Sequence, residues 1–143
     1  MPRGVPRLTE MHRRRGGWSV PQPTTYRGYR YRSRAEANYA RTLDLRLAAK
    51  DIKAWERPLP FRLMVSGNLC GHYTPDFLVT LKDGTKELIE VKGWAARDFV
   101  LRLKVFKALY PEWKIRVIDG QGRPWKATRS ARALPGLRRK GAA

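Results

Sequence analysis

The sequence has almost no cysteine, because Cys70 is the only one among 143 residues. An internal disulfide is therefore excluded, which favours a reducing compartment such as the cytoplasm. Cys70, His72 and the distant His12 are too few and too badly spaced for a structural zinc site. No apolar run is long enough to span a bilayer, and the first residues lack the apolar stretch of a signal peptide, so we expect no membrane partner.

Acidic residues are also scarce, with 12 Asp and Glu against 31 Lys and Arg, and the formal net charge is +19. Residues 1–32 and 121–143 each carry a net charge of +7, and the remainder carries only +5. Two arms of one sign repel each other until a polyanion neutralises them. This pattern favours nucleic acid as the partner over a merely solubilising surface.

The sequence divides into a flexible basic arm (residues 1–25), one domain (26–120) and a basic C-terminal tail (121–143). The first arm contains four prolines and a Gly-Gly pair, and it has no helical or strand periodicity. Residues 26–32 alternate tyrosines with arginines. The rings could stack on bases while the guanidinium groups bind phosphates, or the segment could be an edge strand with one face on the core. The two interpretations are compatible.

Apolar periodicity predicts an α/β domain with a mixed central sheet flanked by helices. The expected helices cover 33–50 and 97–110, and the expected strands cover 52–57, 61–65, 73–81, 86–92 and 113–118. Ser33 is a suitable N-cap for the first helix, and Pro111 ends the second. Asp83-Gly84 lies between two apolar runs, which predicts an antiparallel hairpin.

Three polar residues stand on the two strands of this predicted hairpin. Glu90 and Lys92 are two residues apart, so their side chains share one face, while Val91 points to the opposite face, into the core. Asp76 and Glu90 lie at nearly matching distances from the turn, so we expect their carboxylates to converge. Converging carboxylates repel unless a divalent cation neutralises them, and magnesium is the hard ion that suits oxygen ligands.

Such a site can cleave a phosphodiester bond. A bound metal ion polarises the phosphate and lowers the pKa of a bound water. Lys92 is placed to orient that water or to stabilise negative charge on the phosphate. Glu36, in the first turn of the first predicted helix, could complete the site from another direction, and two metal ions then become possible.

Each residue of this set also has a purely structural explanation. Ser33-x-x-Glu36 matches a capping box, Asp76 could cap a turn, and Glu90-x-Lys92 could be a solvated ion pair. However, Asp76 and Glu90 stand inside otherwise apolar strands. Burying a charge costs several kcal/mol unless it is paired or holds a metal, so stability alone does not select this arrangement.

Pro75-Asp76 followed by Glu90-x-Lys92 resembles the PD-(D/E)xK nuclease superfamily. Over about residues 32–118, the chain is most similar to phage endonuclease I-type Holliday-junction resolvases. The resemblance rests on these segments: Ser33-x-x-Glu36, Tyr73-Thr-Pro-Asp-Phe-Leu78, Lys92-Gly-Trp94 and Tyr110-Pro-Glu112. It implies a restriction-endonuclease-like fold.

The resemblance also implies a function and a set of site residues. Glu36, Asp76, Glu90 and Val91 would bind Mg²⁺, with Mn²⁺ as a substitute, and Lys92 would be catalytic together with the three acids. Members of this family are homodimers that cut branched DNA on two opposed strands, leaving 5′-phosphate and 3′-hydroxyl ends. A phage-encoded enzyme of this kind would act in the cytoplasm of the bacterial host.

The basic residues expected to contact DNA are Arg27, Arg30, Arg32, Arg34, Arg97 and Lys104. Two other functions are also compatible with the sequence. One is a site- or mismatch-directed endonuclease of the transposon-end, very-short-patch or restriction type, which shares the Asp and Glu-x-Lys core. The other is a basic nucleic-acid-binding protein without catalysis.

Overall fold

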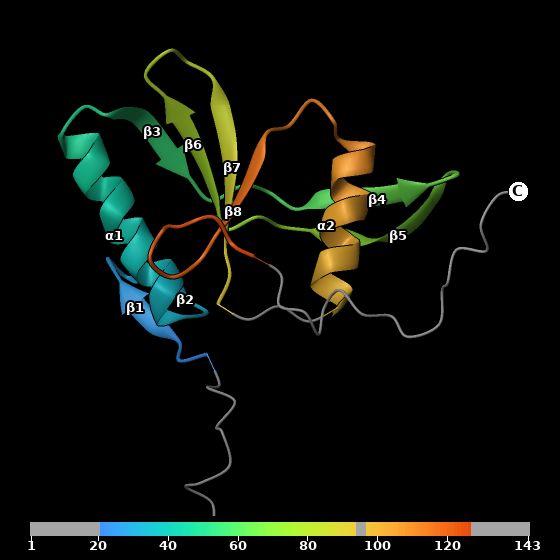
Figure 1. The fold of residues 1–143 in the computed structure, drawn as a ribbon, viewed down its shortest axis with the longest axis horizontal. Coiled ribbons are helices and arrows are strands. Elements are labelled where there is room, and N and C mark those ends of the chain that lie inside the picture. The colour runs from blue at the N-terminus through green and yellow to red at the C-terminus, as the bar shows by residue number, and fades with distance from the viewer. Residues whose placement is uncertain (1–20, 94–96, 127–143) are drawn as a thin grey trace, which may run out of the picture.

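The computed structural model of the chain describes residues 21–93 and 97–126 (Figure 1). Predictions that fall on residues 1–20, 94–96 and 127–143 lie outside the described residues. They include most of both basic arms and the aromatic residue Trp94. No helix of the described part is long and apolar enough to cross a membrane.

The described chain is a mixed α/β structure with two helices. Its elements in chain order are β1 (Thr24–Tyr26), β2 (Tyr29–Tyr31), α1 (Arg34–Ala48), β3 (Ile52–Glu56), β4 (Phe61–Val65), β5 (Asn68–Tyr73), β6 (Phe77–Leu81), β7 (Lys86–Val91), α2 (Arg97–Leu109) and β8 (Ile115–Ile118). The predicted helices and most of the predicted strands are confirmed within a few residues.

Four strands form the central sheet, in the order β3-β6-β7-β8. The pairs β3–β6 and β6–β7 are antiparallel, and β7–β8 is parallel, so the predicted mixed sheet is confirmed. The predicted hairpin between β6 and β7 is also confirmed, because the Leu81 amide donates to the Thr85 carbonyl across the turn at 2.8 Å. Gly84 has a φ of 88°, a left-handed conformation that glycine adopts without steric cost.

The two faces of the central sheet carry different layers (Figure 1). On one face, Ala40 and Leu43 of α1 pack in a buried cluster with Phe77, Val79 and other sheet residues. On the other face, α2 and the β4–β5 hairpin form a second cluster around Phe106. This alternation follows from the period of two along a strand: in β7, Ile89 and Val91 belong to the first cluster and Leu88 to the second.

The predicted continuous strand over 73–81 is wrong, because the chain changes sheets in the middle of it. Tyr73 ends β5 and pairs with Phe61 of β4, whereas Phe77 begins β6 and pairs with Ile89 of β7. Pro75 lies between them and has no N–H to donate to a sheet ladder. The strand β5 itself was not predicted. The break places Asp76 at the start of a strand rather than inside one.

Residues 26–32 form the end of β1, a turn and all of β2, so the single edge strand expected there is a hairpin. Arg27 and Gly28 in the turn have φ angles of 46° and 77°. Positive φ at both central residues is the turn geometry that matches strand twist in two-residue hairpins. Because β1 begins at Thr24, the fold starts two residues before the predicted domain boundary.

The described chain continues past the predicted start of the C-terminal tail. The Trp125 amide donates to the Val117 carbonyl at 3.0 Å, and its ring lies edge-on to that of Phe99 at 5.9 Å between centroids. Pro124 forms an isolated bridge with Ile118. Residues 121–126 therefore fold back onto β8 and α2.

Candidate active site

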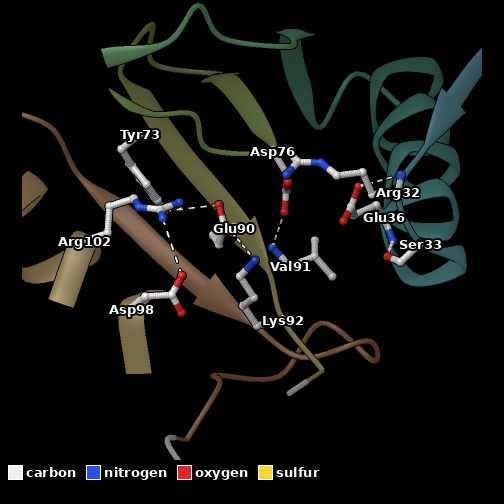
Figure 2. Close-up of polar contacts among 10 residues, drawn as sticks. All are labelled: Arg32, Ser33, Glu36, Tyr73, Asp76, Glu90, Val91, Lys92, Asp98 and Arg102. Atoms are coloured by element: carbon white, nitrogen blue, oxygen red, sulfur yellow. Dashed lines mark hydrogen bonds and ion pairs between the residues drawn. The ribbon is translucent and has the colours of Figure 1, made fainter. Parts of the chain in front are cut away.

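Asp76 lies where β6 begins, beside the end of β7. Its amide donates to the Ile89 carbonyl at 3.1 Å, and its carboxylate Oδ2 accepts a 2.8 Å hydrogen bond from the Val91 amide. The side chain thus lies across the end of the neighbouring strand (Figure 2). The amide and carbonyl of one residue in a β-strand point to the same edge, so the Val91 carbonyl lies on the edge that faces Asp76.

Glu90 and Lys92 lie on one face at the end of β7, as predicted, and they form a close ion pair. The Glu90 side chain is buried, with Oε1 2.8 Å from Lys92 Nζ. Its other oxygen, Oε2, accepts a 3.1 Å hydrogen bond from the Tyr73 hydroxyl. The Lys92 ammonium also lies 4.6 Å from the centroid of the Phe99 ring, a cation–π contact. Val91, between them, packs into the opposite core, which confirms the predicted alternation.

Glu36 comes to the site from the first turn of α1. Ser33 is the N-cap of this helix, and its hydroxyl accepts from the Glu36 amide at 3.2 Å. In a capping box, Glu36 would accept from the Ser33 amide. Here its Oε2 accepts from the Arg32 amide at 3.2 Å, so only one of its two oxygens serves the helix end.

The Asp76 carboxylate is affected electrostatically by the two other carboxylates. The pKa of Asp76 is raised to about 7, mainly by burial and then by the Glu90 and Glu36 carboxylates, while the Val91 amide and Lys92 oppose the shift. Burial also raises the pKa of Glu36, against the opposing effects of Arg32 and Lys92. In the close-up, Asp76 lies between Glu36 and Glu90 (Figure 2). Glu36, Asp76 and Glu90, which are distant in the chain, therefore lie toward the same end of the sheet (Figure 2).

Among the described residues, no three His, Cys, Asp or Glu side chains are arranged so that they could hold a metal ion together. Both Glu90 oxygens are engaged, by Lys92 and by Tyr73. The donor chemistry nevertheless fits a hard divalent cation, because the cluster consists of carboxylates and one strand-end carbonyl. The pKa of Asp76 is raised mainly by burial and then by the Glu90 and Glu36 carboxylates, and a bound cation would offset the second effect.

The predicted DNA-contact residues differ in how close they lie to the candidate site. Arg30 and Arg32 line a cavity that also includes Glu36 and Asp76. Arg27, in the β1–β2 turn, lies 3.4 Å from Asp44 in an ion pair and is 75% exposed.

The remaining predicted contacts are less closely tied to the site. Arg34 is exposed at the start of α1, and the side chain of Arg97 is outside the described residues. Lys104 is exposed on α2, about 200° around the helix from Arg102. Arg102, which was not predicted, is the α2 residue that lies beside Tyr73 in the close-up (Figure 2).

The tyrosines of residues 26–32 contact the protein itself rather than presenting bare faces for bases. The Tyr26 hydroxyl donates to Asp44 at 2.6 Å, and Tyr31 is buried. The Tyr29 ring is covered by the guanidinium of Arg57, whose Cζ lies 3.4 Å from its centroid. These contacts agree with the strand interpretation of the segment, which forms a hairpin, and base stacking by Tyr29, which is 42% exposed, stays a prediction.

Sequence reasoning missed Tyr73 and Arg57 as residues of the site. Tyr73 stands in the Tyr-Thr-Pro-Asp segment of the resemblance, which was the one signal for it, but the pattern gave it no role. Arg57 carries no local signal, because it is held at the site by stacking on Tyr29 of β2, which is distant in the chain.

A family model described as "Protein of unknown function (DUF1064)" matches residues 21–121. The chain belongs to this family. No curated protein and no solved structure matches the chain. The matched residues of DUF1064 include Glu36, Asp76, Glu90 and Lys92, and they exclude most of both basic arms.

Proposed function

We propose that the chain is a metal-dependent DNA endonuclease of the PD-(D/E)xK type, with a restriction-endonuclease-like arrangement of its sheet and helices. It hydrolyses phosphodiester bonds to 5′-phosphate and 3′-hydroxyl ends. One observation carries this proposal: Asp76, whose carboxyl has a pKa raised to about 7, lies between Glu36 and the buried Glu90–Lys92 pair. Stability alone does not favour this accumulation of charge at a sheet end.

In this proposal the side chains of Glu36, Asp76 and Glu90 and the carbonyl of Val91 would hold Mg²⁺. No three acidic side chains of the described residues are grouped for a metal as they stand, so these side chains would have to draw together around the ion. Mn²⁺ has similar ligand preferences and should substitute. When bound, the ion supplies positive charge at the phosphate and a water of lowered pKa. The Val91 amide, which donates to Asp76 Oδ2, orients one of the two Asp76 oxygens and leaves Oδ1 for the ion.

Lys92 is the catalytic cation in this proposal. Glu90 holds its ammonium at 2.8 Å, and the Phe99 ring lies beside it, so the long side chain is ordered before substrate arrives. An ordered ammonium can donate to an attacking water and stabilise the charge that develops on the phosphate. Tyr73 acts through Glu90 and is a positioning residue.

Branched DNA is the substrate we propose, in the manner of a Holliday-junction resolvase or debranching nuclease. The +19 charge of the chain supports a nucleic-acid partner. Two opposed cuts in a junction require two active sites, so we propose a homodimer. The setting we propose is the cytoplasm of a bacterial host, with the gene carried by a phage.

A panel of synthetic DNAs tests the substrate. Four-way junction, flap, mismatched duplex and plain linear duplex are incubated with the full chain and Mg²⁺, and initial cleavage rates are compared. We expect the junction to be cut fastest, with paired cuts on opposed strands. Equal rates on junction and plain duplex would contradict branch selectivity, and preference for the mismatched duplex would favour a mismatch-directed enzyme.

A further inference from the structure

A cavity of about 110 Å³ opens beside Glu36 and Asp76. Its other walls come from β2, from the Arg57-Pro58 connection after β3, and from Thr74-Pro75. Three arginines, Arg30, Arg32 and Arg57, therefore line the same space as two of the candidate metal ligands.

Arg57 is held in place by two tyrosines of the β1–β2 hairpin. Its guanidinium lies over the Tyr29 ring, with Cζ 3.4 Å from the centroid, and its Nη1 donates to the Tyr31 hydroxyl at 3.4 Å. Stacking of this kind uses the flat face of the guanidinium and leaves N–H groups along its edge for an anion. Because the side chain is already ordered, little conformational entropy is lost when it binds.

The charge and size of the cavity fit a phosphate group. Within the part of the chain that the structure describes, none of the three arginine side chains forms an ion pair with a carboxylate. Guanidinium groups match phosphate oxygens in pairs. Pockets that enclose a whole organic ligand measure roughly 300–1,000 Å³. This cavity is smaller, so it can take a phosphate while the attached sugar and base remain outside.

We propose that this cavity binds a backbone phosphate of the cleaved strand and that Arg57 is its principal ligand. The inference rests on the proposed nuclease function, and it adds a residue and a subsite to it. A phosphate held there is next to Glu36 and Asp76, so the strand enters the site with one fixed contact beside the metal ligands. Tyr29 positions Arg57 and does not itself touch the strand.

The test measures binding of a four-way junction by the full chain in EDTA, where cleavage does not occur. Arg57→Gln is compared with Arg41→Gln, a matched control, because Arg41 also lies over a tyrosine of the hairpin, with Cζ 5.2 Å from the Tyr26 centroid, but does not line the cavity. Both arginines are exposed, so neither change should unfold the chain, and circular dichroism checks this.

We expect Arg57→Gln to bind the junction about tenfold more weakly than the wild-type chain does. Its slope of log affinity against log salt should be lower by about one. Arg41→Gln should change the affinity and the slope less. Junctions with a single uncharged methylphosphonate at successive positions then locate the contact. The wild-type chain should bind more weakly when the methylphosphonate replaces one phosphate near the cleaved bond. Arg57→Gln already lacks this contact, so it should bind that modified junction as well as it binds the unmodified one.

The results separate this inference from the proposed function. If Arg57→Gln matches Arg41→Gln in affinity and in its methylphosphonate pattern, or if the wild-type chain does not bind the junction, the phosphate subsite is wrong. If the position-specific loss depends on Arg57 but the wild-type chain cuts none of the DNAs with Mg²⁺, the subsite stands and the nuclease proposal fails.

Discussion

The Asp76 carboxylate accepts a 2.8 Å hydrogen bond from the Val91 amide, which joins the start of β6 to the end of β7. The Asp76 side chain is thereby fixed to the backbone of β7 at the end of the paired part of the two strands. The Asp76 amide also donates to Ile89 at 3.1 Å, so both ends of the residue are held by β7. Such anchoring lets an ionisable group remain half-buried beside other acids, which is the arrangement expected of a site and not of a turn cap.

Replacing Asp76 by asparagine should stabilise the metal-free chain at high pH. The pKa of Asp76 in the fold is about 7, against about 3.9 in an unfolded chain, so the folded state binds the extra proton between these values. Stability of the wild-type chain therefore falls as pH rises from about 4 to about 7. The Asp76→Asn variant has no such penalty, and we expect a gain on the order of 2 kcal/mol at pH 8 in EDTA.

Urea unfolding of the two chains at pH 4, 6 and 8 measures this difference. The gain from Asp76→Asn should be smallest at pH 4 and should level off above pH 7. A gain that does not depend on pH, or a loss at pH 8, would show that the ionised carboxylate is not disfavoured in the fold. With Mg²⁺ present, metal affinity of the wild-type chain should rise with pH up to about 7 and then flatten, because protons and metal compete for Asp76.

Glu36→Gln should separate metal binding from helix capping. Glutamine keeps an oxygen that can accept from the Arg32 amide, so the helix end should lose little stability. Removal of the negative charge should lower metal affinity at least about tenfold. Ser33→Ala is the matched control: it removes the hydroxyl that accepts from the Glu36 amide and should cost about 1 kcal/mol without a comparable loss of metal affinity. Calorimetric titration with Mn²⁺ and urea unfolding measure the two effects, and equal metal affinity in Glu36→Gln and wild type would remove Glu36 from the ligand set.

Tyr73→Phe should disturb Glu90 without removing any charge. The lost hydroxyl donates to Glu90 Oε2 in a buried position, so we expect a loss of about 1.5–3 kcal/mol in stability. Because Glu90 also holds Lys92, cleavage should slow by about tenfold while junction binding is kept. In the control, Tyr39→Phe, the ring that packs 5.4 Å from Phe77 remains, and both properties should stay near wild type. If the two variants cleave equally, Tyr73 does not position the site.

Asp44→Ala should be strongly destabilising although Asp44 lies outside the site. Asp44 accepts from the Tyr26 hydroxyl at 2.6 Å and from Trp55 Nε1 at 3.0 Å, so it connects β1 and β3 to α1. Removing it leaves two partly buried donors without an acceptor, which should cost about 3 kcal/mol. Asp51→Ala breaks an exposed ion pair with Arg46 and should cost less than about 1 kcal/mol. Similar losses in the two variants, measured by urea unfolding, would contradict this account of the hairpin.

Local signals were enough to predict the elements whose ends are determined by residues close by in the sequence. Ser33 predicted the start of α1, and Asp83-Gly84 predicted the β6–β7 turn, where Asp83 Oδ1 accepts from the Thr85 amide at 2.9 Å. That turn determines the register, and the register brings Asp76 and Glu90 toward the same end of the sheet. The three hairpin residues of the site could therefore be placed from the sequence alone.

What could not be predicted depends on contacts between distant segments. Strand β5 contains Gly71 and exposed polar residues, so its apolar pattern is weak, and it is a strand because it pairs with β4. The chain passes from one sheet to another just before Asp76 for the same reason, because β5 pairs with β4 and β6 pairs with β7. Arg57 becomes part of the site only through its stacking on Tyr29, which no local pattern indicates.

Cleavage of a synthetic four-way junction with and without Mg²⁺ tests the central claim most directly. The full wild-type chain should cut the junction in Mg²⁺ and not in EDTA. Asp76→Asn and Lys92→Ala should each lower the rate by at least about a thousandfold while junction binding in EDTA is largely kept. Cutting that persists in EDTA, or that survives both substitutions, would contradict the account.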